Sequence, residues 1–482
     1  MRLKSGIKTA LLGIGMCFAG CNNVQRVPEP DKTLDSVPVI FPDYSNVTIP
    51  CNIAPLNFRL EVDADDAVAV IEGRGGRIVV DGDDGDFVIP GKAWKSLLAS
   101  TMDNDSLSVT VYAQNDNEWT SYRPFYWFVS SDGIDSYLAY RLIEPGYELW
   151  HTMGIYQRNL SDFEQKAIIT NEETKNNCMN CHSFNNRSSE QMIFHMREKL
   201  PGTYLVNNEG VEKLITSKGQ SLVYPFWHPS GKFIAFSSNQ TKQGFHMNDR
   251  NLIEVYDISS DLLVYDLQGH RIISDSIIAS GKSLETFPTF SPDGKKLYFC
   301  SAEARSLPQE YDKVKYNLCS VDFDVETGCF GDDVDTLFNA IKEDKSVSFP
   351  RISPDGKWMM FTVSDYGNFS IWHKSADLVM IGLEDGRIYD LSGVNSDDVE
   401  SYHSWSSNGR WVVFSSRRMD GLYTCPFIVY VDKDGKFGKP FVLPQKSPEF
   451  YRDFMYSFNI PEFVNGQVEI DKSKLLNAAN AE

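Results

Sequence analysis

Residues 287–295 read Phe-Pro-Thr-Phe-Ser-Pro-Asp-Gly-Lys, and the same pattern recurs three more times along the chain. The other copies are Tyr-Pro-Phe-Trp-His-Pro-Ser-Gly-Lys at 224–232, Phe-Pro-Arg-Ile-Ser-Pro-Asp-Gly-Lys at 349–357 and Tyr-His-Ser-Trp-Ser-Ser-Asn-Gly-Arg at 402–410. Each copy begins with an aromatic residue and has a phenylalanine twelve positions after its start. The starts lie 63, 62 and 53 residues apart. Such recurrence indicates a protein built from copies of one supersecondary unit.

The physics of the repeat predicts short antiparallel strands. Proline fixes φ, aspartate caps the turn and glycine adopts a positive φ, so Pro-Asp-Gly forms a tight turn. Alternating apolar residues follow, as in 232–236, and predict a strand. A unit of more than about 40 residues with several such strands is typical of a propeller blade. The pattern resembles the blades of TolB-like (WD40-like) β-propellers over about residues 200–450.

The number of blades follows less directly from the sequence. Residues 202–206 and 211–215 form a further predicted strand pair, and residues 451–468 are positioned to close the ring. We therefore predict a mainly β protein whose C-terminal propeller, over 201–470, has five or six blades.

Composition and charge exclude several classes of protein. The 482 residues are 42% hydrophobic and 23% charged, which is typical of folded globular domains. The net charge is −20. A chain this acidic is repelled by nucleic acid and by anionic membrane surfaces, so nucleic acid is excluded as a partner.

The first residues predict export. Basic residues at 2, 4 and 8 precede an apolar stretch of about eleven residues, which is too short to span a bilayer as a helix. The stretch ends in Phe-Ala-Gly-Cys at 18–21 and resembles the lipobox of bacterial lipoproteins. That resemblance implies a signal peptide over 1–20, lipidation of Cys21 and anchoring to the cell envelope, with the outer membrane as the expected location. The mature chain has 43 basic and 66 acidic residues, a charge of −23.

Four further segments complete the predicted organisation. Residues 21–37 are polar and turn-prone, which predicts a tether. Residues 38–145 alternate apolar and polar runs between Gly/Asp turns, which predicts an Ig-like β-sandwich. Residues 146–200 are expected to form a short helical or irregular segment, and 471–482 a polar C-terminal tail.

Residues 178–182 read Cys-Met-Asn-Cys-His, which matches the CxxCH motif for covalent attachment of a c-type haem. In that chemistry the two thiols add to the haem vinyl groups and the adjacent histidine binds the iron. We therefore predict one haem c attached to Cys178 and Cys181, with His182 as the proximal iron ligand. Spacing leaves the sixth iron position open: the candidates are His195, Met192, Met196 and a more distant residue, or the position has no protein ligand.

Three other uses of these residues remain open. Cys178, Cys181, His182 and His195 have the chemistry of a zinc site, but the usual second ligand pair is absent. Cys178 and Cys181 also suit a redox pair or a structural disulfide in an oxidising compartment. The pairing of the other cysteines of the mature chain is not decided by the sequence; these are Cys51, Cys300, Cys319, Cys329 and Cys425.

The signal, the motif and the propeller together resemble a group of exported bacterial proteins that are described as cytochrome-related or TolB-like. The resemblance implies a membrane-anchored monohaem cytochrome c-like protein that transfers or senses electrons, with a redox partner and a protein partner docked on the propeller. The alternative is a haem-free propeller adaptor or binding lipoprotein with a structural CxxC. A propeller hydrolase is a third hypothesis, but no Gly-x-Ser-x-Gly motif supports it. An electron carrier or binding protein is expected rather than an enzyme.

Two histidines depart from the repeat. His228 replaces its serine and His403 replaces its proline. We expect both to line the central channel of the propeller.

Overall fold

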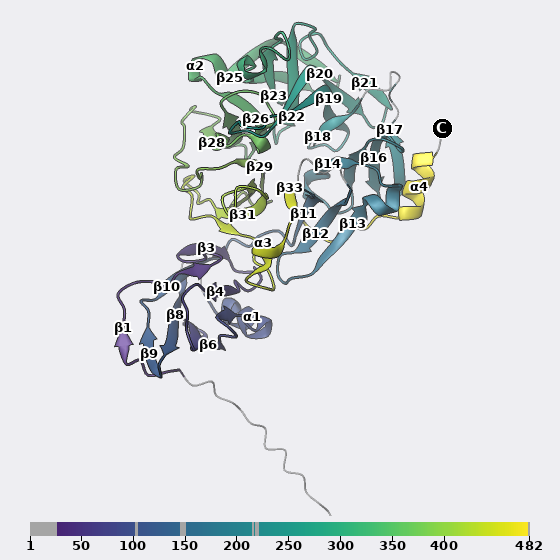
Figure 1. Ribbon diagram of the computed structural model, residues 1–482. Coiled ribbons are helices and arrows are strands. Elements are labelled where there is room, and N and C mark those ends of the chain that lie inside the picture. Colours follow the sequence, from purple (N-terminus) through teal and green to yellow (C-terminus); the bar gives the residue numbers. More distant parts are fainter. Residues whose placement is uncertain (1–26, 102–104, 145–150, 215, 217–220, 481–482) are drawn as a thin grey trace, which may run out of the picture.

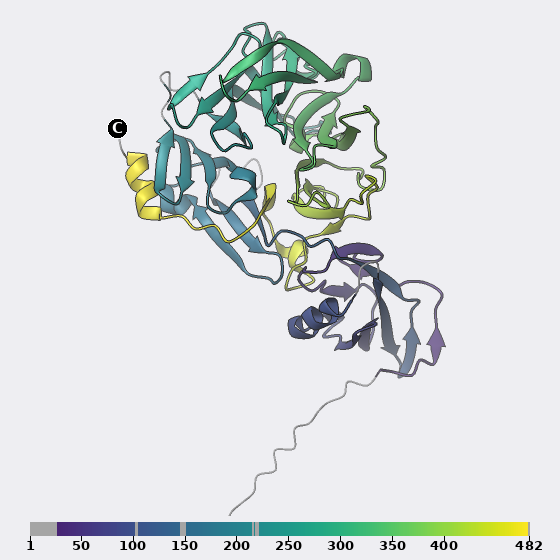
Figure 2. The same cartoon turned by 180° about the vertical axis from the view of Figure 1, so that it is seen from behind.

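The computed structural model describes residues 27–101, 105–144, 151–214, 216 and 221–480. The expected signal peptide and Cys21 lie outside these residues. Six small β-sheets are arranged in a ring, and a smaller domain lies against the outside of the ring (Figures 1 and 2). The protein is therefore mainly β, with a propeller of six blades.

Each blade is an antiparallel sheet, and the strand that is named first for each blade below lies nearest the axis (Figure 1). Blade 1 contains β33 (Ser457–Val464), β11 (Tyr137–Ile143), β12 (Met153–Asn159) and β13 (Gln165–Thr170). Blade 2 contains β14 (Met179–Phe184), β15 (Met192–Met196), β16 (Gly202–Asn207) and β17 (Gly210–Leu214). Blade 3 contains β18 (Val223–Trp227), β19 (Phe233–Phe245), β20 (Ile253–Asp266) and β21 (Arg271–Ile273).

The remaining three blades follow in chain order. Blade 4 contains β22 (Ser283–Phe290), β23 (Lys296–Glu303), β24 (Asn317–Asp324) and β25 (Cys329–Phe338), and the short helix α2 (Ala340–Glu343) follows it. Blade 5 contains β26 (Ser346–Ile352), β27 (Trp358–Ser364) and β28 (Asp377–Gly382). Blade 6 contains β29 (Glu400–Trp405), β30 (Trp411–Ser416), β31 (Cys425–Tyr430) and β32 (Phe441–Val442).

The ring closes by joining distant parts of the chain. The C-terminal strand β33 pairs antiparallel with β11, and Phe458 lies opposite Leu142 in this register. The rings of Phe458 and Tyr140 lie 4.9 Å apart between centroids. This pairing covers the inner edge of blade 1 with a strand from the end of the propeller, so blade 1 holds the two ends of the ring together.

The six inner strands share a bulge. One residue in each has a left-handed φ of 51–53°, and the pairing register shifts at or beside that residue. These residues are Cys181, Tyr224, Phe287, Phe349, Tyr402 and Ile460. Four of the six begin the repeats found in the sequence. Aromatic rings from neighbouring blades meet near the axis, with centroids of Phe287 and Phe349 only 4.0 Å apart. We call these six residues the axial plug.

The Pro-Asp-Gly turn is confirmed, and one glycine in it supports a blade-to-blade contact. Gly294 has a φ of 74°, and its carbonyl lies 3.0 Å from Nε2 of His228. A Cβ atom at Gly294 would lie 2.4 Å from that nitrogen, whereas one at Gly356, with the same φ, would meet nothing within 4 Å.

We therefore expect Gly294→Ala to lower the free energy of unfolding by about 2–3 kcal/mol and Gly356→Ala by about 1 kcal/mol. Both variants carry the left-handed backbone strain, and only the first displaces His228. Urea denaturation of the two proteins measures the difference. Equal losses would contradict the described contact.

The segment 146–200 differs from the expectation. Its described part contributes β12 and β13 to blade 1 and β14 and β15 to blade 2, with short 3-10 turns at Asn171–Thr174 and Asn185–Arg187. The CxxCH motif therefore lies at the inner strand of a blade rather than in a helical or irregular segment. The reason is tertiary: all six residues of β14 are buried between neighbouring blades.

The N-terminal domain has two sheets and one helix. The larger sheet contains β1 (Lys32–Thr33), β9 (Glu118–Ser121), β8 (Asp105–Asn115), β10 (Phe125–Ser130), β3 (Val47–Pro50), β5 (Asp66–Gly73) and β6 (Gly76–Asp81). The smaller sheet contains β2 (Ile40–Phe41), β4 (Phe58–Leu60) and β7 (Asp86–Phe87). The helix α1 (Gly91–Ala99) buries Trp94 against the same core. Since β1 pairs with β9, the last part of the expected tether belongs to the sandwich.

The sandwich is fixed to blade 6. Nε1 of Trp411 donates to the carbonyl of Asp132 (2.8 Å), and the hydroxyl of Tyr430 donates to the carboxylate of Asp132 (2.9 Å). One hydrophobic cluster runs from the sandwich into blades 5 and 6. The short helix α3 (Phe450–Asp453) lies at this junction (Figure 1).

The C-terminal residues also differ from the predicted polar tail. Residues Lys472–Asn480 form helix α4, which lies on the outer strand of blade 2 (Figure 1). Leu475 and Ala479 are buried there, because two apolar residues four positions apart share one helix face. No helix in the described ranges is long and apolar enough to cross a membrane.

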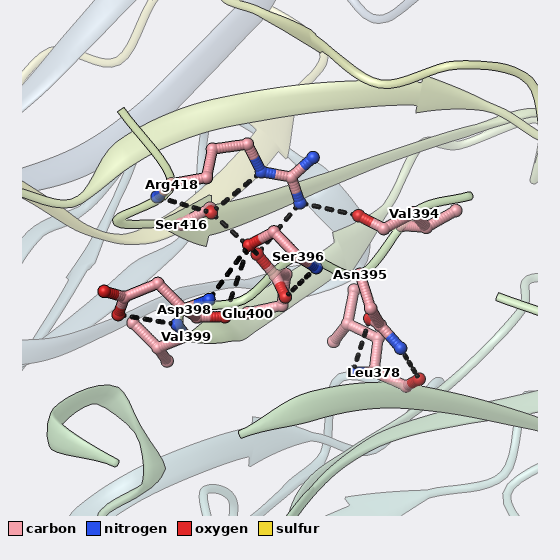
Figure 3. A network of polar contacts seen from close by, with 9 residues as sticks. All are labelled: Leu378, Val394, Asn395, Ser396, Asp398, Val399, Glu400, Ser416 and Arg418. Atoms are coloured by element: carbon pink, nitrogen blue, oxygen red, sulfur yellow. Dashed lines mark hydrogen bonds and ion pairs between the residues drawn. The ribbon is translucent and has the colours of Figure 1, made fainter. Parts of the chain in front are cut away.

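A buried acidic residue in blade 6 has a structural role. The carboxylate of Glu400 accepts hydrogen bonds from Arg418, Ser416 and Ser396 at 2.6–2.9 Å (Figure 3). Its charge is therefore fully paired, as a buried carboxylate requires. This network joins the inner strands of blade 6 to the loop that follows blade 5.

Candidate functional site

Two cavities lie along the axis, on either side of the axial plug. The arginine cavity, of about 240 Å³, is lined by Arg141, Arg197 and Arg417 together with Cys178 and Cys181. The histidine cavity, of about 120 Å³, is lined by His182 and His403 together with Arg351 and Glu462. Tyr402 and Ile460 border both. The two thiols of the CxxCH motif therefore border the arginine cavity, and its imidazole borders the histidine cavity.

The two thiols are buried beside positive charge. Cys178 is 8% exposed and Cys181 is 6% exposed, and both are free thiols. Burial raises the pKa of Cys178, while Arg141 and Arg197 oppose that shift. Burial also raises the pKa of Cys181, and the nearby Cys178 adds to the rise. Both groups are therefore held as neutral thiols rather than as reactive thiolates.

Arg417 is the most buried cation of the arginine cavity. Its guanidinium lies over the Trp372 ring, 4.1 Å from the centroid. Burial lowers its pKa to about 10, while Asp398, Tyr402 and Asp420 act in the opposite direction. Within the described part of the chain, Nε of Arg417 is buried without a hydrogen-bond partner, and so is Nε of Arg141.

A long hairpin covers the arginine cavity. Strands β19 and β20 extend beyond their blade, and Thr241, Gln243 and Val255 from this extension line the cavity. We call residues 239–257 the covering hairpin.

Contacts to blades 4 and 5 hold the covering hairpin in place. The carboxylate of Glu254 accepts from the Tyr366 hydroxyl (2.5 Å), and that of Asp257 accepts from the Asn368 amide (2.6 Å). The Tyr316 hydroxyl lies 3.5 Å from Asp257. Burial raises the pKa of Asp257 to about 6, against the lowering effect of the Asn368, Asn239 and Tyr316 hydrogen bonds.

The histidine cavity holds two neutral imidazoles. His182 and His403 are 3% and 2% exposed, and burial lowers the pKa of each to about 3. Neither ring nitrogen of His182 has a described hydrogen-bond partner of normal geometry, although the Ile460 backbone lies close enough to oppose the pKa shift. Nε2 of His403 lies 2.9 Å from the Met360 carbonyl. Burial raises the pKa of Glu462 to about 7, while Phe184, Arg351 and Arg187 act to lower it.

The depressed pKa of His403 predicts a pH-dependent contribution to stability. Its folded pKa lies below the unfolded value of 6.5, so the contribution is complete above pH 6.5 and is lost as the pH falls toward about 3. Between about pH 3 and pH 6.5, this one histidine makes the free energy of unfolding fall by about 1.4 kcal/mol for each unit that the pH falls. Replacing it removes that part of the pH dependence. We expect the stability difference between wild type and His403→Gln to change by that amount per unit.

Urea denaturation at about pH 6 and pH 4.5 measures this difference. The exposed His270, changed to Gln, is the matched control. A difference between His403→Gln and wild type that does not change with pH would contradict the buried neutral imidazole.

The candidate sixth ligands do not converge on His182. Met192 and Met196 lie in the core shared by blades 1 and 2. His195 lies opposite Asn180 in the β14–β15 register, and its Nδ1 lies 2.9 Å from the Thr203 hydroxyl. Burial lowers its pKa to about 3.

The zinc alternative lacks a cluster of ligands. Cys178 and Cys181 border the arginine cavity, whereas His182 borders the histidine cavity. Nδ1 of His195 is hydrogen-bonded with the Thr203 hydroxyl. Among the residues that the structure describes, no three His, Cys, Asp or Glu side chains are grouped to hold a metal ion.

The arrangement of the motif does not fit a haem. Attachment through CxxCH needs both thiols and the imidazole on one cofactor, and here they border cavities on opposite sides of the axial plug. Both cavities are also smaller than the roughly 300–1,000 Å³ that a drug-sized ligand occupies.

The two histidines predicted to line the channel have different places. His403 lines the histidine cavity, as expected. The expectation for His228 is wrong, because its ring packs among Phe233, Phe290 and Phe323 between blades 3 and 4. Sequence reasoning also missed Arg141, Arg197 and Arg417. They lie in three distant segments and form no local motif, so only the folded ring brings them together.

No family model matches this chain, and no curated protein matches it. Among solved structures, an oligogalacturonate lyase in complex with manganese is 12% identical, with a TM-score of 0.37 over 63% of this chain and 73% of that one. A puromycin-hydrolysing peptidase of Mycobacterium tuberculosis is 12% identical, with a TM-score of 0.38 over 86% of this chain. This chain covers 57% of that peptidase. An oligogalacturonate lyase of Vibrio parahaemolyticus is 10% identical, with a TM-score of 0.33 over 59% of this chain and 85% of that one.

Proposed function

We propose that this chain is a haem-free, exported and lipid-anchored propeller that binds a ligand in its axial channel. One observation carries the proposal: the CxxCH motif forms the inner wall of the channel, with thiols and imidazole on opposite sides of the axial plug. A wall of this kind suits a binding site, because it places a few polar groups around an enclosed, mostly preformed space.

The arginine cavity is the better candidate for the binding site. It is the larger of the two axial cavities, and the covering hairpin can control access to it. Its lining combines charged groups with apolar and aromatic side chains, as in small-molecule sites. The lipid anchor at Cys21 would hold the sandwich near the outer membrane. The propeller would then present this face to the ligand, and a protein partner of the binding lipoprotein would dock on the outside of the ring.

The rival function is the monohaem cytochrome, which the exact CxxCH spacing and the export signal favour. It would need the bulge at Cys181 to rearrange, so that Cys178, Cys181 and His182 could face one haem. The sixth position would then be taken by His195, by Met192 or Met196, or by a more distant residue, or it would stay open. Electron transfer would also need a redox partner.

Native-state alkylation tests whether a small solute reaches the proposed site. Iodoacetamide is added to the folded mature chain, and modified cysteines are mapped by mass spectrometry. We expect exposed Cys329 to react first, Cys178 more slowly, and Cys300, which is 0% exposed, only after unfolding. Equal protection of Cys178 and Cys300 would show a sealed cavity and would contradict the proposal.

A further inference from the structure

We propose that the arginine cavity binds a small organic carboxylate, an inference that rests on the proposed haem-free channel site. Arg141 comes from β11, Arg197 from the segment after β15 and Arg417 from the segment after β30, and all three border the same cavity. Arg417 is buried, Arg141 is partly buried and Arg197 is exposed, so the three positive charges border one cavity with different access to solvent. An anion bound beside Arg417 would pair with a buried positive charge.

The three guanidinium groups have hydrogen-bonding capacity to spare. None of them forms an ion pair within 4.0 Å among the described residues, unlike Arg418 in the neighbouring network. Arg141 donates through Nη2 to the side-chain oxygen of Asn459 when that amide is correctly oriented. Arg417 is 8% exposed, and its Nε is buried and unpartnered. A buried donor without a partner is costly, and a bound anion would satisfy it.

The surrounding charge favours an anion. Glu144 is the only carboxylate among the residues described as lining this cavity, and it accepts a hydrogen bond from the Thr152 amide (3.0 Å). The cavity therefore carries a net positive charge in a chain whose net charge is −20. The positive potential inside the cavity attracts anions, whereas the acidic outer surface of the protein repels them.

The walls and the size favour an organic acid over a bare inorganic anion. Ile143, Val255 and Ile371 line the cavity beside the aromatic rings of Tyr224 and Trp372. These side chains suit a hydrocarbon body, while the planar guanidinium groups suit the two oxygens of a carboxylate. The volume of about 240 Å³ limits the ligand to a compact molecule.

Titration calorimetry and thermal unfolding of the mature chain test the inference. The probes are sodium succinate, citrate and benzoate, each up to about 10 mM at constant ionic strength, with inorganic phosphate as a separate arm. We expect at least one carboxylate to bind and to raise the Tm of the wild type. Arg417→Gln should weaken its Kd at least tenfold, because a buried charge-assisted hydrogen bond is lost.

Matched variants keep the test decisive. Arg197 is exposed, so Arg197→Gln should fold normally and still weaken binding about threefold or more. Arg305→Gln, on the surface of blade 4, makes the same change of charge outside the cavity and should leave the Kd unchanged. Binding of phosphate alone, no binding of any carboxylate, or equal affinity in all three variants would each overturn the inference. Cys178 alkylation of the same samples tests the proposed function separately. If iodoacetamide reaches Cys178 but no carboxylate binds, only the proposed ligand class is overturned, and the proposed channel site is not.

Discussion

Truncation of the chain after Asp453 is expected to abolish folding of the propeller, whereas truncation after Asp471 is expected to leave it folded. The first truncation removes β33, the inner strand of blade 1, together with its pairing to β11. Blade 1 would then expose an unpaired strand edge and the apolar surface around Phe458 and Phe463, which are both fully buried. The second truncation removes only α4, and with it the burial of Leu475, which costs about 1.5–3 kcal/mol.

Circular dichroism, gel filtration and limited proteolysis of the two truncated proteins measure the outcome. A milder version keeps the full length: Phe458→Ala should lower the free energy of unfolding by about 3–5 kcal/mol, because it leaves a cavity beside Tyr140. Phe128→Ala, at a position 45% exposed, should cost less than about 0.5 kcal/mol. A cooperative, protease-resistant propeller in the chain truncated after Asp453 would show that β33 does not close the ring.

Shortening the covering hairpin should raise the rate of Cys178 alkylation at least tenfold. Replacing residues 242–256 by a two-residue Asn-Gly turn keeps the Thr241–Asp257 pair and removes Gln243 and Val255 from the cavity lining, together with Glu254 and its bond to Tyr366. Local opening of such a cover costs free energy, and each 1.4 kcal/mol of that cost slows access about tenfold. Cys300, in the blade 4 core, is the internal control and should stay protected.

The variant Tyr366→Phe gives an intermediate case. It keeps the hairpin and removes one hydroxyl that contacts Glu254 and Asn251. We expect a rise in Cys178 reactivity that is smaller than that of the shortened hairpin. Unchanged Cys178 reactivity in both variants would mean that the hairpin does not control access to the arginine cavity.

Only the blades that contain the aromatic start and the glycine turn of the repeat could be predicted from the sequence. Blades 3 to 6 carry an aromatic start and a glycine turn, and their glycines adopt the left-handed conformation that the pattern requires. Blade 2 has Cys181 at the plug position and the sequence Asn-Asn-Arg at 185–187 in place of the Pro-Gly turn, so it has no repeat signature. Blade 1 is assembled from the two ends of the propeller chain, and no local pattern reports that.

The candidate site was predictable only in part, for a related reason. The motif at 178–182 predicted a haem-attachment segment before the propeller, and its place beside the axis was not predicted, because its conformation depends on burial between two blades. That burial forms a strand with a left-handed Cys181 and separates the thiols from His182. Arg141, Arg197 and Arg417 approach one another only after the ring closes, and isolated arginines in three segments carry no signal of their own.

A pyridine haemochrome spectrum decides whether the CxxCH motif is a channel wall or a haem attachment site. The chain is produced with an export signal, without Cys21, in cells that contain a cytochrome c maturation system, beside Cys178→Ala. We expect a folded protein without covalent haem in both cases. A stoichiometric haemochrome spectrum and a denaturation-resistant haem band in the parent chain, lost in Cys178→Ala, would contradict it.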